Sequence, residues 1–330
     1  MANKLQFYTE LSDRQTRQVT GSRKSWTGFL EAAGRLYKYP FEEQLMIFAQ
    51  RPNATACAEL ATWNKPLNRY VRRCSKGIAL LDQSGDKPRL RYVFDIADTE
   101  DGRQNARKPF VWELKPEHEQ AVIEAIDRAY DIDSFMGRDG FSGSALIGRD
   151  MGDVIFGLAH ELSARYYEDN KSDIGYCVEG SFIEDFDELN IEVAFREALT
   201  VSVAYSLMTR CGIDPTEYIE DEDFQPIFDF NSPSSVHALG GAVSAVTEEV
   251  LREIEIAVKK QERERSGQHE RSHIQQERRL FDTRHSDTGD GGPGQIRDDA
   301  EELSAPAPPD TLHELHADGD AVSPLPGDRD

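Results

Sequence analysis

Cations and aromatic residues are interleaved in the first hundred residues of the chain. The set comprises Gln50, Arg51, Asn53, Trp63, Lys65, Arg69, Tyr70, Arg72, Arg73, Lys76 and Tyr92. Alternate residues of a strand share a face, and a hairpin that follows can bring further cations alongside. Single-stranded DNA is held by cations along its phosphates and by flat side chains that stack on unpaired bases. The pattern therefore predicts a basic groove for DNA binding that is tolerant of sequence.

The same residues have a plainer interpretation. An exposed edge strand often carries positive charge that prevents aggregation, and its aromatic residues then belong to the core. Composition alone favours this second interpretation, because runs of charge are usually solvated faces.

His160 and Glu161 lie together in the segment LAHELSAR. Zinc proteases of the zincin type use H-E-x-x-H, because residues four apart place both imidazoles on one face of a helix. Here the fifth position is Ala164, so the motif is broken. A match of two residues also arises by coincidence in unrelated helical domains.

Charge is distributed unevenly along the 330 residues. Residues 1–94 hold 16 Lys and Arg against 8 Asp and Glu, whereas the rest of the chain holds 22 against 53. A basic front joined to an acidic remainder indicates that the two parts meet different partners.

The elements that must position the basic residues are predicted as a small α+β domain over residues 1–112. Apolar spacing predicts a helix from Trp26 to Tyr37 and a second helix at 41–49 that begins after Pro40. Strand-like segments follow at 69–74, 77–81 and 89–94, with a turn at 84–86. Two helices and an antiparallel, hairpin-rich sheet are therefore expected.

Residues 113–262 are predicted to be mostly helical. Pro116 starts one helix, Asp150 caps another, and the apolar segment 192–211 ends at Gly212. A fourth helix carries Val243 to Val258 on one side. Residues 263–330 are charged and rich in Pro and Gly, which predicts a disordered acidic tail.

Several classes of protein are excluded by missing patterns. No stretch approaches the roughly 18 apolar residues of a membrane helix, which predicts no membrane partner. No secretory signal is readable, and the four cysteines form no C-x-x-C pair, so reduced thiols and a cytoplasmic location are expected. Neither an ATPase loop, a methyltransferase signature nor a G-x-S-x-G elbow is present.

A series of motifs resembles the ArdC-type N-terminal domain of antirestriction proteins, which also stands at the front of LtrC-like conjugation proteins. These motifs are SWTGFL at Trp26, Tyr39, QRP at 50–52, TWN at 62–64, KGI at 76–78, YVFD at 92–95 and DT at 98–99. The resemblance implies binding of single-stranded DNA in conjugative transfer or antirestriction, with conjugation or restriction proteins as further partners. One departure is Cys74, where the family commonly has Gly; a positive φ there would make Cys unfavourable.

The resemblance also implies a metalloprotease-like domain behind the DNA-binding part. Glu197 resembles the acidic ligand that a later helix supplies in that family. His160 and Glu197 leave at most two ligands, whereas a catalytic zinc has three and a water. We therefore expect a degenerate zincin-like scaffold with no zinc, no other cofactor and no catalytic residue. The alternatives are a zinc protease that acts on a restriction or host factor, and an acidic protein that mimics DNA.

Overall fold

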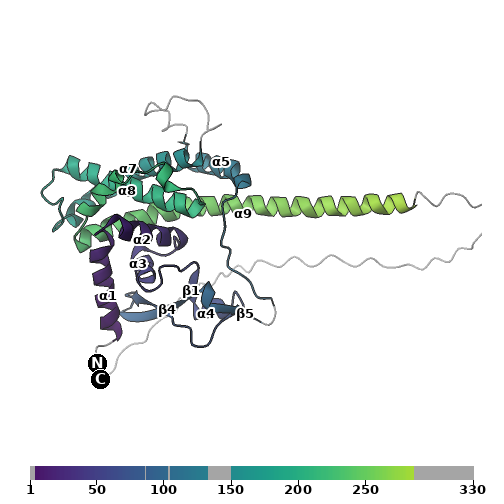
Figure 1. Cartoon of the computed structure of the whole chain (residues 1–330), viewed down its shortest axis with the longest axis horizontal. Helices are drawn as coiled ribbons and strands as arrows, with labels where there is room; N and C mark the ends of the chain where they lie inside the picture. Colours follow the sequence, from purple (N-terminus) through teal and green to yellow (C-terminus); the bar gives the residue numbers. More distant parts are fainter. Residues whose placement is uncertain (1–3, 86, 103–104, 133–149, 286–330) are drawn as a thin grey trace, which may run out of the picture. The chain divides into compact units, whose positions relative to one another are not determined.

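Three helices open the computed structural model, which describes residues 4–85, 87–102, 105–132 and 150–285, with side chains up to residue 266. They are α1 (Lys4–Val19), α2 (Arg23–Arg35) and α3 (Phe41–Gln50) (Figure 1). Ser22 caps α2 by accepting a hydrogen bond from the Ser25 amide at 3.2 Å. The two predicted helices are confirmed, and α1 is an addition that the sequence analysis did not predict.

Short antiparallel strands follow the three helices. One sheet has the order β1-β4-β3, and a separate ribbon pairs β2 with β5. In the predicted β3–β4 hairpin, Ala79 stands opposite Tyr92. The expectation that all the predicted strands share one sheet is wrong, because β2 pairs with a strand beyond the hairpin. The elements are β1 (Cys57–Glu59), α4 (Leu60–Asn64), β2 (Arg69–Val71), β3 (Ile78–Asp82), β4 (Arg89–Asp95), η1 (Ile96–Asp98) and β5 (Thr99–Asp101).

The remainder of the described chain is helical. Asp150 caps α7 as predicted, since its carboxylate accepts a hydrogen bond from the Gly152 amide at 3.0 Å. Gly212 ends α8 in the left-handed conformation at φ 77°, and α9 continues past residue 263, where the tail was expected to begin. The elements are η2 (Pro116–His118), α5 (Glu119–Tyr130), α7 (Met151–Cys177), α8 (Glu188–Cys211), η3 (Pro215–Glu217), η4 (Glu222–Asp229) and α9 (Pro233–His285). The fold is thus mostly helical with a small antiparallel sheet.

The main hydrophobic core continues across residue 112. Side chains of α2 and α3, such as Trp26 and Phe41, belong to the same buried cluster as side chains of α7, α8 and α9. The indole Nε1 of Trp26 donates to the Ser202 hydroxyl of α8 at 2.9 Å. The described residues up to His273 belong to one compact unit. The domain division at 112 remains a prediction, and the core itself shows no gap there.

Two further predictions concern membrane-spanning helices and the C-terminal tail. Within the residues that the structure describes, no helix is both long enough and apolar enough to cross a bilayer. The predicted acidic tail falls largely on residues 286–330, which lie outside the described residues.

Candidate nucleic-acid interface

A groove of about 710 Å³ is formed by α1, α3, β3, β4 and the turn that precedes β3. It combines positive charge with aromatic rings, and it has both polar and apolar walls. Its lining residues are Lys4, Phe7, Tyr8, Gln50, Arg51, Lys76, Gly77, Ile78, Tyr92 and Asp98.

Four of the predicted site residues line this groove, and two of them are free to contact a ligand. Lys76 is exposed and forms no hydrogen bond or ion pair within the described part of the chain. The Tyr92 side chain is 40% exposed. Lys76 and Tyr92 therefore offer a cation and a ring to the same space.

Helix α1 supplies a second cation and a second exposed ring. Phe7 is 55% exposed, and its ring and the Tyr8 ring make a T-shaped contact with a centroid distance of 5.2 Å. Tyr8 packs on the small core beneath, whereas Lys4 is exposed. The sequence analysis missed these residues. The spacing of Leu5, Tyr8 and Leu11 was the available signal, but polar residues interrupt it before Val19.

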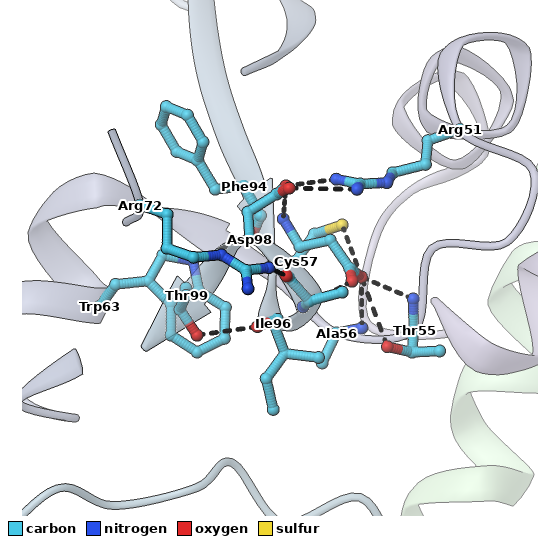
Figure 2. A network of polar contacts seen from close by, with 12 residues as sticks. Arg51, Thr55, Ala56, Cys57, Trp63, Arg72, Phe94, Ile96, Asp98 and Thr99 are labelled. Carbon is cyan, nitrogen blue, oxygen red and sulfur yellow. Dashed lines mark hydrogen bonds and ion pairs between the residues drawn. The ribbon is translucent and has the colours of Figure 1, made fainter. Parts of the chain in front are cut away.

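Arg51 is occupied by an ion pair rather than free for phosphate. Its guanidinium donates to both carboxylate oxygens of Asp98, with Nη2–Oδ1 at 3.1 Å, and the two groups face each other in Figure 2. Asp98 is only 8% exposed. The hydrogen bond with Asp98 raises the pKa of Arg51. The prediction that Arg51 contributes a free cation is therefore corrected.

Gln50 has a structural role at the base of the groove. Its side-chain Nε2 donates to the carbonyl of Ala79 at 2.8 Å, and its Oε1 accepts from the Ala79 amide at 2.9 Å. The amide thus joins α3 to β3 through both of its polar atoms. The expectation that Gln50 contacts DNA is corrected, since its hydrogen-bonding groups are already satisfied.

Trp63 and Arg69 are buried, which contradicts their predicted place in the groove. Trp63 is 1% exposed, and its Nε1 donates to the Phe94 carbonyl at 2.9 Å. Arg69 is 6% exposed and is held by Thr99 and Asp101 of β5. The plainer interpretation holds for Trp63, whose indole belongs to the interior. Arg69 fits neither interpretation, because it is buried and joins the two strands of the β2–β5 ribbon.

The remaining predicted residues are at the surface but do not line the groove. Tyr70 is 48% exposed on β2. The Arg72 guanidinium donates to the Ala97 carbonyl, which ties the turn before β3 to η1. Arg73 is exposed in the same turn as Lys76, and Asn53 and Lys65 are exposed elsewhere.

The turn that carries Lys76 has two unusual backbone positions. Cys74 has φ 69°, which is the left-handed region that favours glycine. At Gly77, an added Cβ would lie 3.2 Å from both the Tyr92 Cβ and the Phe94 ring. The absence of a side chain at Gly77 therefore lets the turn pass close to the Tyr92 side chain.

Of the three residues predicted as remnants of a metal site, His160, Glu161 and Glu197, the structure brings only two together. His160 and Glu197 line one cavity of about 510 Å³, but Glu161 is not among its lining residues. Across the described ranges, no group of three or more His, Cys, Asp or Glu side chains is placed to hold a metal ion. His160 and Glu197 alone are one ligand short of a catalytic zinc site, so the donors do not fit that metal.

Comparison of the chain with protein-family models, with curated proteins and with solved structures gives no match. The resemblance to the ArdC-type domain therefore stays a prediction that rests on the motifs quoted above. Function has to be argued from the chemistry of the groove.

Proposed function

We propose that the groove lined by α1, α3 and the β3–β4 hairpin binds single-stranded DNA with little preference for sequence. The observation that carries the proposal is the presence of two exposed rings, Phe7 and Tyr92, beside two exposed lysines, Lys4 and Lys76. Stacking of one base on an aromatic side chain contributes roughly 1–3 kcal/mol and is tolerant of base identity.

The charges of the groove suit a phosphate backbone. Lys4 and Lys76 are point charges on flexible stems, which follow a backbone without fixing its geometry. Arg51 and Asp98 neutralise each other, so the net positive charge comes from the lysines. Both lysines are exposed, and binding should therefore weaken steeply with salt.

Tolerance of sequence follows from the same lining. A side-chain amide can read a base edge only if its donor and acceptor are free. The Gln50 amide is instead engaged by Ala79. Stacking also requires an unpaired base, since the faces of bases in a duplex are already covered. The proposal thus includes a preference for single strands over duplex.

The biological setting of this activity is proposed from the motif resemblance alone. A DNA-binding accessory protein of a mobile element would act in the cytoplasm, in conjugative transfer or in protection of incoming single-stranded DNA from restriction. Conjugation or restriction proteins would then be its further partners.

Fluorescence anisotropy of the full chain with labelled oligothymidine and with a duplex of equal length tests the proposal. Tyr92→Ala should weaken single-strand binding about tenfold, the equivalent of roughly 1.4 kcal/mol. Tyr70→Ala is the matched control, because Tyr70 is a similarly exposed tyrosine on β2, in the separate β2–β5 ribbon and outside the groove. Equal binding of duplex, or equal weakening in the two variants, would contradict the proposal.

A further inference from the structure

The first half of α8 exposes an apolar face that no part of the described chain covers. Leu189 is 68% exposed and Val193 is 44% exposed, and the two lie one helical turn apart. Phe186, immediately before the helix, is 45% exposed, and Phe182 is 71% exposed. Contiguous exposed patches of large apolar side chains mark interaction sites, whereas single exposed apolar residues are common on any protein surface.

This apolar face borders a continuous depression between α8 and η4. The cavity of about 510 Å³ and a second one of about 380 Å³ share Val193, Glu197 and Pro226 in their linings. Phe186 lines the second cavity. Together they form a trough beside the exposed helix face, which we call the α8 trough.

The α8 trough is acidic, and the segment that contains α8 and η4 is acidic as a whole: residues 177–231 contain 14 Asp and Glu against 2 Lys and Arg. Glu197, Glu222 and Asp229 line the trough, and their carboxylates form no ion pair within the described ranges. Arg196, the cation in the lining, is paired with Glu192 at 2.9 Å. Burial raises the pKa of Asp229, as expected for a carboxylate without a cation partner.

These properties select the class of ligand. Unpaired carboxylates repel nucleic acids and anionic lipid surfaces, whereas they attract Lys and Arg. The apolar side chains beside them require apolar groups in the same ligand. We propose that the α8 trough is the docking site for a basic amphipathic helix of a partner protein, with apolar residues at helical spacing and Lys or Arg at their edges.

A labelled synthetic peptide tests this inference on the full chain. The probe has Leu at positions i, i+3, i+4 and i+7 and Lys between them, and a second peptide replaces each Leu by Ser. We expect the Leu peptide to bind about tenfold more tightly than the Ser peptide, because only the former fills the apolar face.

Charge reversal locates the binding site. Glu197→Lys combined with Leu189→Asp should weaken binding of the Leu peptide by about tenfold or more. Asp13→Lys is the control for charge, since Asp13 is an exposed carboxylate on α1 outside both cavities. Circular dichroism and thermal melting establish that the variants are folded.

Equal binding of the two peptides, or equal weakening in the double variant and in Asp13→Lys, would overturn the inference. A peptide that fails to bind while the chain dimerises through Leu189 would also overturn it, in favour of a second copy as the occupant. Oligothymidine binding should be unchanged in the double variant, so this test is independent of the proposed DNA groove.

Discussion

Arg51 and Asp98 form a two-point ion pair at one wall of the groove. Arg51 directly follows α3, and Asp98 closes η1 before β5. Asp98 Oδ2 also accepts a hydrogen bond from the Asp95 amide at 3.3 Å, within a capping box that fixes η1. The pair therefore joins the end of α3 to η1. Because its charge is already paired, Arg51 has a structural role, and the cations available to a ligand are Lys4 and Lys76.

Removal of Arg51 should destabilise the fold. Arg51→Ala leaves the nearly buried Asp98 carboxylate without its partner, and we expect the free energy of unfolding to fall by about 1–3 kcal/mol. Urea denaturation measures this change. Lys76→Ala is the control, because Lys76 has no described partner and its removal should leave stability within about 0.5 kcal/mol. Similar stability of the two variants would show that the ion pair does not join these elements.

Cys74→Gly should stabilise the protein. A non-glycine residue in the left-handed region costs about 1–2 kcal/mol, and the greater freedom of glycine in the unfolded chain offsets part of that gain. We expect a net increase of about 0.5–1 kcal/mol in the free energy of unfolding. Ser75→Gly, at the next residue and without a positive φ, should instead lower stability. Thermal melting of both variants decides the question, and a decrease of stability in Cys74→Gly would contradict the assigned backbone conformation.

Acid should weaken the contact between α9 and the segment after α2. Burial raises the pKa of Glu255, but hydrogen bonds from Lys259, Lys38 and Tyr37 outweigh burial and lower that pKa to about 2 from an ordinary value of 4.5. A depressed pKa means that the contribution to stability is complete above about pH 4.5 and is lost as the pH falls toward 2. Glu255→Gln should thus cost about 2 kcal/mol at pH 7 and progressively less in acid. Urea denaturation between pH 7 and pH 3 tests this, and a pH-independent difference would contradict it.

The cations of the groove should determine its salt dependence. For a single strand, the slope of log affinity against log salt falls by about 0.7 for each phosphate that the protein no longer neutralises. Lys4→Ala and Lys76→Ala should each show this reduction, whereas Lys65→Ala should not, because Lys65 lies outside the groove. Titrations at several salt concentrations measure the slopes. An unchanged slope in both groove variants would place the phosphate-binding cations elsewhere.

Sequence patterns predicted the helices better than the site. Asp150 and Gly212 mark helix ends through local backbone chemistry, which the neighbouring residues alone determine. The surroundings of Trp63 and Arg69 depend instead on strand pairing, and β2 pairs with β5 across the intervening hairpin. That pairing holds Arg69 against Thr99 and Asp101, whereas the Trp63 indole of α4 donates to the Phe94 carbonyl of β4, so neither side chain is available to the groove.

The groove could be predicted only in part, because some of its lining residues are brought together by contacts between segments that are distant in the sequence. Lys76 lies in the turn just before β3 and Tyr92 lies on the paired strand β4, whereas Phe7 is brought in by α1 through tertiary packing on α3 and β3. A helix with an interrupted apolar pattern gives no local sign of such packing. Cys74 is the converse case, because the motif comparison singled out that position and the structure gives it a positive φ.

The most direct test of the DNA-binding groove is photo-crosslinking with oligothymidine that carries 5-iododeoxyuridine, followed by tryptic digestion and mass spectrometry. Phe7 and Tyr92 lie in separate peptides, Leu5–Arg14 and Tyr92–Arg103, and Tyr70 lies in a third, Tyr70–Arg72. We predict crosslinks in the first two peptides that disappear on competition with unlabelled single strand. Crosslinks confined to the Tyr70 peptide, or none at low salt, would contradict the proposal.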